Sequence, residues 1–262
     1  VYRDIITAGT SDHAVYANLA AICWMQGRFD ELIDLLHQAL ALKPNCSETH
    51  YNLGKALKAR GDLDAAIVSY RKALELNPGY PEAHYNLGNA LKVQGDIDAA
   101  IASYCKALDL NPKYPEAHGN LGNAFMKRGN LDAAIASYRK ALELKLNSPE
   151  VHGNLGNACM EKGDLDAAIA SYRKALELKW NYPEAHYNLG NALKEQGDLP
   201  AAIAAYNRAL KSRPSYPEAC NNLGNAFMEQ GGLDAAIASY GKALELKPNY
   251  PEAHGNLGNA LV

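Results

Sequence analysis

Asparagine recurs along this chain at a spacing suited to binding a peptide backbone. Asn86 and Asn89 stand three residues apart, and the same pair returns 34 residues later at Asn120 and Asn123. On a helix, a spacing of three puts both side chains on one face. Each carboxamide offers two donors and an acceptor oxygen, so it can bond the carbonyl and the amide of an extended peptide whatever its side chains. The pattern indicates repeated, sequence-independent recognition.

The asparagines form two rows with this period. The first row is Asn52, Asn86, Asn120, Asn154, Asn188, Asn222 and Asn256, and the second is Asn89, Asn123, Asn157, Asn191, Asn225 and Asn259, with Lys55 as the exception. Helices about 10 Å apart would present one clamp per roughly three residues of a ligand that rises about 3.3 Å per residue. The alternative interpretation is that these amides serve solubility and hydrogen bonding between neighbouring helices.

Histidines and paired acids also recur, but neither set predicts catalysis or metal binding. The histidines that share one repeat position are His50, His84, His118, His152, His186 and His254. Zinc needs donor nitrogens about 2.0 to 2.1 Å from one ion, whereas equivalent side chains on stacked helices start roughly 10 Å apart. Asp96 and Asp98 stand where helix caps and first-turn acids belong. We therefore expect no enzyme activity in this segment, no metal and no cofactor.

Composition restricts the partner and the compartment. The net charge of −3 over 262 residues gives no global attraction for nucleic acid. The apolar stretches fall far below the roughly 20 residues that cross a bilayer, and no segment reads as a signal peptide. The five cysteines are odd in number and lack Cys-x-x-Cys spacing, which indicates unpaired thiols. We expect a cytoplasmic protein in a reducing compartment whose partner is a protein or peptide, not nucleic acid or membrane.

The asparagines recur with a strict 34-residue period, so a structural unit of that length must position them. It predicts a stack of small, similar units at residues 47–80, 81–114, 115–148, 149–182, 183–216 and 217–250. A degenerate unit covers 13–46. Extending the register makes 1–12 the end of the second helix of a truncated repeat and 251–262 the first helix of another. We expect these ends to expose apolar faces that allow end-to-end self-association.

Each unit reads as two helices. Pro81 and an acid after it favour the first turn of a helix that ends near Gly95, because glycine adopts the left-handed conformation that closes a helix. Asp96 can then cap a second helix over about 97–110, which Asn111 and Pro112 stop. Small side chains let the two helices approach closely, and Tyr104 is expected to fill the remaining space.

The residues that carry this packing are Leu87, Gly88, Ala100, Tyr104, Ala107 and Pro112, at positions 7, 8, 20, 24, 27 and 32 of the unit. This pattern resembles the tetratricopeptide repeat family. The resemblance implies an all-α fold, a right-handed superhelical solenoid of antiparallel helix pairs. The degenerate first unit departs from it, with Ala20 in place of the glycine and Leu36 in place of the aromatic residue.

In that family, positions 5, 6 and 9 of the first helix belong to a concave groove. The resemblance therefore implies that the asparagine rows, together with Tyr85 and Tyr187, line a peptide-binding groove. The first row is similar to the asparagine ladder of O-linked N-acetylglucosamine transferases, which holds substrate peptides by their backbones. It implies a protein–protein interaction scaffold. The alternatives are the substrate-recognition arm of a larger enzyme, such as a transferase of that kind, and a self-assembling array.

Two departures from the repeat bear on this surface. Position 5 is tyrosine at Tyr51, Tyr85 and Tyr187 but glycine at Gly119, Gly153 and Gly255, which predicts a more open stretch where a bulky ligand side chain would fit. Leu146 and Trp180 stand where the family has proline, with an effect on superhelical pitch that the sequence leaves open. We expect Trp180 to cover the apolar seam between two units, with a partner anchor as the alternative.

Overall fold

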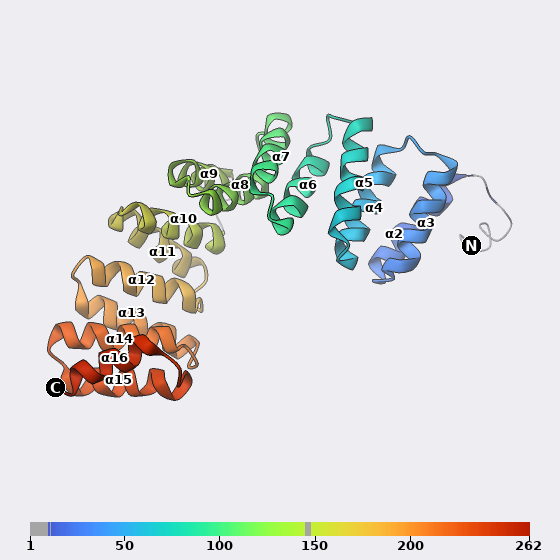
Figure 1. The fold of residues 1–262 in the computed structure, drawn as a ribbon. Helices are drawn as coiled ribbons and strands as arrows, with labels where there is room; N and C mark the ends of the chain where they lie inside the picture. Colours follow the sequence, from blue (N-terminus) through green and yellow to red (C-terminus); the bar gives the residue numbers. More distant parts are fainter. Residues whose placement is uncertain (1–9, 11, 145–147) are drawn as a thin grey trace. The chain divides into compact units, whose positions relative to one another are not determined.

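A computed structural model of the chain describes residues 10, 12–144 and 148–262. These residues form fifteen α-helices, labelled α2 to α16, and contain no strand (Figure 1). The predicted all-α fold is therefore confirmed. The chain divides into two compact units, Val1–Gly129 and Asn130–Val262, which are described one at a time. The prediction for 1–12 and the open question about Leu146 fall almost entirely outside the described residues.

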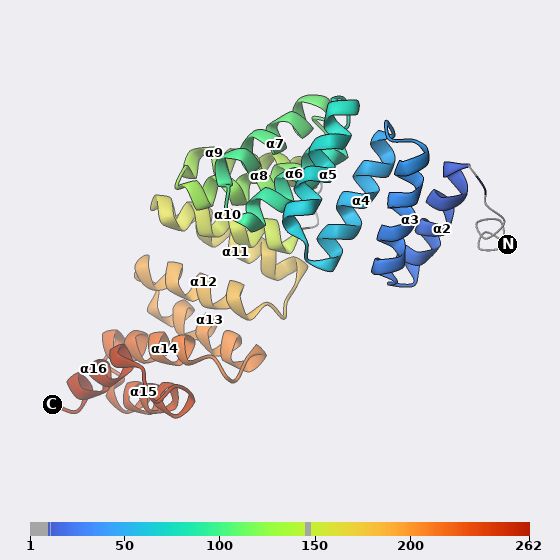
Figure 2. The same ribbon diagram turned by 45° about the vertical axis from the view of Figure 1, so that its right-hand side comes forward.

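The first unit is a row of helix pairs in which each helix packs against the next along the chain (Figure 2). Its helices are α2 (His13–Met25), α3 (Phe29–Leu42), α4 (Ser47–Arg60), α5 (Leu63–Leu76), α6 (Pro81–Gln94), α7 (Ile97–Leu110) and α8 (Pro115–Arg128). In two cases the first helix of a pair also touches the first helix of the next pair: α4 touches α6, and α6 touches α8. We call the even-numbered helices helix A and the odd-numbered ones helix B.

The second unit follows the same scheme. Its helices are α9 (Leu131–Leu144), α10 (Pro149–Lys162), α11 (Leu165–Leu178), α12 (Pro183–Glu195), α13 (Leu199–Ser212), α14 (Pro217–Gln230), α15 (Leu233–Leu246) and α16 (Pro251–Ala260). Helix A again contacts the next helix A, from α10 through α12 and α14 to α16. Both units are thus arrays of antiparallel helix pairs in which each member touches only near neighbours.

Local sequence signals set the helix ends. Helix α6 begins at Pro81, and Gly95 follows its last residue with a φ of +97°, a left-handed conformation that favours glycine. The carboxylate of Asp96 accepts a hydrogen bond from the Ala99 amide at 3.1 Å and so caps α7. The predicted boundaries of this pair are confirmed.

A buried tyrosine facing a glycine joins the two helices of a pair. Tyr104 on α7 is fully buried, and its ring lies so close to α6 that a Cβ built on Gly88 would stand 2.7 Å from it. The same contact recurs between Gly54 and Tyr70, Gly156 and Tyr172, Gly190 and Tyr206, and Gly224 and Tyr240. The predicted role of these small residues is confirmed.

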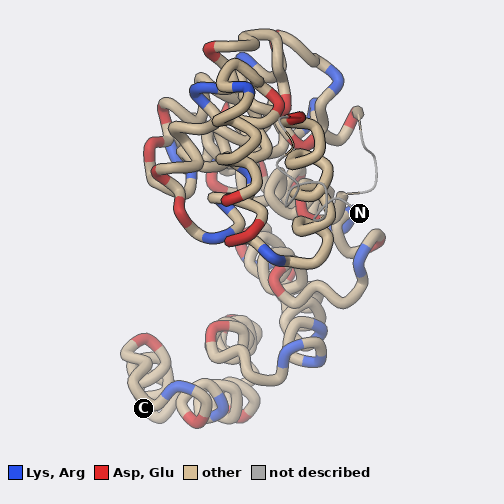
Figure 3. Tube along the Cα trace, turned by 90° about the vertical axis from the view of Figure 1, so that its right-hand side faces the viewer, with Lys and Arg blue, Asp and Glu red and all other residues tan. Residues whose placement is uncertain are grey.

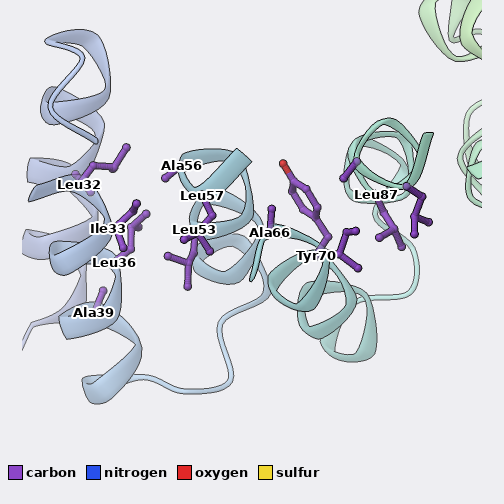
Figure 4. Close-up of a cluster of buried hydrophobic side chains, with 14 of the residues drawn as sticks. Leu32, Ile33, Leu36, Ala39, Leu53, Ala56, Leu57, Ala66, Tyr70 and Leu87 are labelled. Carbon is purple, nitrogen blue, oxygen red and sulfur yellow. The ribbon is translucent and has the colours of Figure 1, made fainter. Parts of the chain in front are cut away.

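The degenerate first pair reaches the same packing with other residues. Leu36 replaces the tyrosine and Ala20 replaces the glycine, and both are buried. The methyl group that Ala20 adds is thus accompanied by a smaller side chain, Leu36, in place of the tyrosine. Figure 4 shows the resulting apolar seam, which runs from Leu36 on α3 past Leu53 on α4 and Tyr70 on α5 to Leu87 on α6.

The expectation that Trp180 covers the seam between two units is wrong. Its side chain is 77% exposed. Trp180 lies in the short connection between α11 and α12, and its carbonyl oxygen is held by the imidazole of His186 at 3.0 Å. The backbone is therefore anchored there while the indole extends into solvent.

Replacing Gly88 with alanine should destabilise the first unit by about 1 to 3 kcal/mol, because the new methyl group would overlap the ring of Tyr104. Denaturant unfolding followed by circular dichroism measures the loss. In a Tyr104→Leu background the same substitution should cost much less, since Ala20 and Leu36 coexist in the first pair.

The matched control is Gly241→Ala on α15, where an added Cβ meets no atom within 4 Å. This change should stabilise the chain by roughly 0.5 to 1 kcal/mol, because alanine loses less backbone entropy in a helix. Equal costs for Gly88→Ala in both backgrounds would contradict the steric explanation.

Candidate functional site

The two asparagine rows meet between successive repeats. In the first unit, the Nδ2 of Asn120 on α8 donates to the Oδ1 of Asn89 on α6 at 3.0 Å. In the second unit the same bond joins Asn188 to Asn157 at 2.9 Å, Asn222 to Asn191 at 2.9 Å, and Asn256 to Asn225 at 3.0 Å. The position 6 asparagine of one helix A is thus tied to the position 9 asparagine of the helix A before it.

The position 9 oxygen accepts a second bond from the buried tyrosine of its own repeat. Tyr104 donates its hydroxyl to Asn89 Oδ1 at 2.8 Å. The equivalent bonds are Tyr172 to Asn157 at 2.9 Å, Tyr206 to Asn191 at 2.8 Å, and Tyr240 to Asn225 at 2.8 Å. These Oδ1 atoms already accept hydrogen bonds within the protein. For the position 9 oxygens, the asparagines therefore serve hydrogen bonding between neighbouring helices. The amide hydrogens of Asn89, Asn157, Asn191 and Asn225 remain for other partners.

The position 5 side chain takes the second hydrogen of the position 6 amide. Asn86 donates to the Tyr51 hydroxyl at 3.0 Å, Asn120 to Tyr85 at 2.9 Å, Asn222 to Tyr187 at 3.1 Å, and Asn256 to Asn221 at 3.0 Å. In addition, Lys92 reaches the Oδ1 of Asn120 at 3.2 Å. Tyr85 and Tyr187, predicted as groove residues, therefore accept bonds from the asparagines beside them. We call this surface of the A helices the asparagine face.

Asn188 differs from these four. Position 5 of the preceding repeat is Gly153, which has no side chain, and the Asn188 amide has only Asn157 as a described acceptor. Beside it lies a cavity of about 350 Å³, with Gly153, Asn157, Tyr182, Glu184, Ala185, Tyr187, Asn188 and Tyr216 as its lining. The more open stretch that glycine at position 5 predicts is present at this point of the asparagine face.

Lys55 interrupts the row of position 9 asparagines, and this leaves a buried tyrosine without its usual hydrogen-bond acceptor. The hydroxyl of Tyr70 is buried and has no hydrogen-bond partner among the described residues, because lysine stands where an asparagine oxygen would accept it. Lys55 instead places its ammonium 4.9 Å from the centre of the Trp24 ring. Both residues line a cavity of about 180 Å³ that also includes Asn52.

The remaining predicted residues lie where the helical register puts them. Asn123 and Asn154 are half-buried on α8 and α10, and Asn259 is exposed on α16. Five of the position 4 histidines bond through Nε2 to a backbone carbonyl oxygen six residues earlier in the chain. These are His50, His84, His118, His186 and His254.

Electrostatics give the asparagine face no dominant sign. Figure 3 shows the positions of Lys and Arg interspersed with those of Asp and Glu along the chain trace. At the cavity, Glu184 is paired with Arg213, so its charge is balanced locally. The guanidinium of Arg213 also lies over the Tyr216 ring, 5.0 Å from its centre. The arrangement suits a neutral or mixed ligand, and the described residues contain no cluster of metal-binding side chains.

Helix pairs repeating every 34 residues, joined by a buried tyrosine, define a helical-repeat protein. Its sequence matches the TPR repeat model over residues 54–95, 156–197, 190–231 and 224–262. Two further tetratricopeptide repeat models match residues 85–150 and 15–48. The chain belongs to the tetratricopeptide repeat family, whose arrays are typical scaffolds for protein–protein interaction and are usually non-catalytic.

Solved structures of this family have similar folds. MamA is 31% identical, with 62% of this chain and 95% of MamA covered and a TM-score of 0.61. The C-terminal part of a TPR repeat-containing protein from Cytophaga hutchinsonii is 20% identical, with coverage of 92% and 98% and a TM-score of 0.76. YrrB, described as a TPR protein with an unusual peptide-binding site, is 24% identical, with coverage of 71% and 96% and a TM-score of 0.64. The last two likenesses concern the fold alone.

A comparison with curated proteins gave no match. Within the described ranges, no helix combines the length and the apolar character that a membrane span requires.

Removing the hydroxyl of Tyr104 should cost about 1 kcal/mol, because Tyr104→Phe deletes the bond to Asn89. The matched variant is Tyr70→Phe in the neighbouring repeat, whose hydroxyl has no described partner. It should leave stability unchanged or raise it. Urea unfolding of both variants tests the assignment, and a larger loss at Tyr70 would refute it.

The buried tyrosines should also make the fold sensitive to alkali. Burial raises the pKa of Tyr104, Tyr172 and Tyr206 well above the ordinary value of 10.0. The folded state therefore keeps protons that the unfolded chain releases near pH 10, so the stability is full below that pH and is lost as the pH rises above it. Helix content and phenolate absorbance should change together above pH 10. Ionisation of these tyrosines with the helices intact would contradict the burial.

Proposed function

We propose that the asparagine face binds an extended peptide segment of a protein partner and that the cavity beside Gly153 receives one of its side chains. The observation that carries this is the unfilled hydrogen-bonding capacity of Asn188 next to a 350 Å³ cavity. Membership in a family of interaction scaffolds supports a protein or peptide as the ligand.

The groups left over by the internal bonds are complementary to a peptide backbone. Asn157 retains two amide hydrogens, and Asn188 retains one hydrogen and its carboxamide oxygen. An extended chain alternates carbonyl and amide groups, so one donor and one acceptor from the protein can engage successive residues. Neighbouring A helices about 10 Å apart match about three residues of such a chain.

The lining of the cavity beside Gly153 determines which side chain of the bound peptide fits into it. Three tyrosines, Tyr182, Tyr187 and Tyr216, contribute to its lining, and the acid there, Glu184, is already neutralised by Arg213. An aromatic or large aliphatic side chain would bury apolar surface against these rings without leaving a charge unpaired. A hydrophobic residue flanked by extended backbone is therefore the expected motif.

The substitution Gly153→Tyr should weaken peptide binding without lowering the stability of the fold. The new tyrosine would give position 5 the residue it has at Tyr187, where the ring packs on Tyr216 with centres 5.0 Å apart and its hydroxyl accepts from Asn222. The substitution supplies Asn188 with an acceptor and fills the cavity. A Cβ at Gly153 meets the Tyr182 hydroxyl at 3.4 Å, so that ring must move slightly. We expect unchanged or higher thermal stability.

Peptide binding should fall at least tenfold, which corresponds to about 1.4 kcal/mol. The probes are dodecapeptides selected on the 262-residue chain from a random phage-displayed library. Gly255→Tyr, in an open position on α16, is the control and should keep full affinity. N-methylation of single peptide bonds in the selected peptides should weaken binding. Failure to select any peptide, or equal affinity for the Gly153→Tyr variant, would reject the proposal.

A further inference from the structure

A larger cavity lies elsewhere in the second unit, on the helix B side. It has a volume of about 820 Å³ and is formed by α11, the connection after it, α12 and α13. Its lining shares no residue with the cavity beside Gly153. The volume falls within the range of about 300 to 1,000 Å³ that is usual for small-molecule sites. We call it the α11–α13 cavity.

A departure from the repeat accounts for part of the space. Position 30, the last residue of helix B, is Ser212 in α13. The other repeats have leucine there, at Leu76, Leu110, Leu144, Leu178 and Leu246. The floor of the cavity is apolar and includes Leu189, Leu193 and Ala205. The exposed indole of Trp180, which stands where the following repeat has Pro214, forms part of the wall.

A second departure changes the charge at the same place. The B helices α5, α7, α9, α11 and α15 carry a lysine followed three residues later by an acid, as in the ion pairs Lys72–Glu75, Lys174–Glu177 and Lys242–Glu245. In α13 these positions are Arg208 and Lys211, and neither forms an ion pair with a described residue. Arg173 contributes a third cation, while the acid of the lining, Glu177, is held by Lys174. The cavity therefore has uncompensated positive charge.

The third observation is a buried polar atom without a partner. His186 is only 7% exposed, and its Nε2 bonds to the Trp180 carbonyl at 3.0 Å. Its Nδ1 is buried and has no hydrogen-bond partner among the described residues, although His186 lines the cavity. Burial, together with the nearby positive charge of Arg208, lowers the pKa of the ring, which is only partly offset by the Trp180 carbonyl. In the neutral ring Nδ1 is an acceptor. Less than 1 Å² of this atom is exposed, so a ligand donor reaches it only after a local shift of the ring.

We propose that the α11–α13 cavity binds a small amphipathic organic acid. Its anionic group pairs with Arg208 and Lys211, and its apolar body lies on the leucine and alanine floor beside Trp180. An O–H or N–H group on that body would satisfy Nδ1 of His186 once a local shift of the ring exposes this atom. Each feature is explained by one ligand class, whereas a cation would meet like charge and a fully apolar molecule would leave the arginine and lysine unused.

The probe for the test is 8-anilinonaphthalene-1-sulfonate, an aromatic sulfonate with an N–H group whose fluorescence rises on transfer to an apolar site. We expect saturable binding that decanoate displaces and decyltrimethylammonium does not. Ser212→Leu, which restores the residue of the other repeats, should weaken binding at least tenfold by filling the space. No saturable binding by the parent chain would overturn the proposal.

Lys211→Glu tests the charge, since five of the other repeats carry an acid at this position, among them Glu75, Glu177 and Glu245. It should weaken the sulfonate and decanoate at least tenfold while leaving the neutral analogue N-phenyl-1-naphthylamine unaffected. Lys113→Glu, an equal charge change at an exposed residue of the first unit, should have no effect. Binding that survives both Ser212→Leu and Lys211→Glu, or that Lys113→Glu weakens equally, would overturn the proposal. Both cavity variants should retain the parent's affinity for the peptides that bind the asparagine face.

Discussion

The contact between the position 24 tyrosine and the position 8 glycine is the interaction on which the rest of this array depends. The ring of Tyr104 fits only because Gly88 has no side chain, so the contact fixes how closely the two helices of a pair approach. The hydroxyl of Tyr104 donates a hydrogen bond to the Oδ1 of Asn89, and the same oxygen accepts a second bond from Asn120 of the next repeat. One side chain therefore links the packing of a hairpin, the joint between repeats and the orientation of the asparagine face.

Much of this fold could be predicted because its signals are local. Pro81, Gly95 and Asp96 determine helix ends through backbone conformation and capping, which need no knowledge of distant residues. The sharing of the Asn89 oxygen could not be predicted in the same way, since it depends on the placement of the following repeat. The exposure of Trp180 could not be predicted for a similar reason: a tryptophan side chain favours burial, but the connection between α11 and α12 directs this indole into solvent.

The candidate binding sites lie where the chain departs from its own repeat. A residue present in every unit is constrained by packing against identical neighbours, so its polar groups tend to be satisfied internally. Gly153 removes an internal acceptor and leaves Asn188 with spare capacity, while Lys211 and Ser212 remove a charge partner and an apolar plug from α13. In a nearly uniform array, specificity can therefore reside in a small number of irregular positions on separate faces.

Lys55, which stands at repeat position 9, affects how the array unfolds. In a one-dimensional repeat protein, cooperativity is carried by nearest-neighbour coupling. Lys55 deprives the joint between α4 and α6 of the shared asparagine oxygen and leaves Asn86 bonded to Tyr51. We therefore expect this joint to couple its neighbours less strongly than the others. The helices before it would then exchange their amide hydrogens through a sub-global opening in which α6 and α7 stay folded.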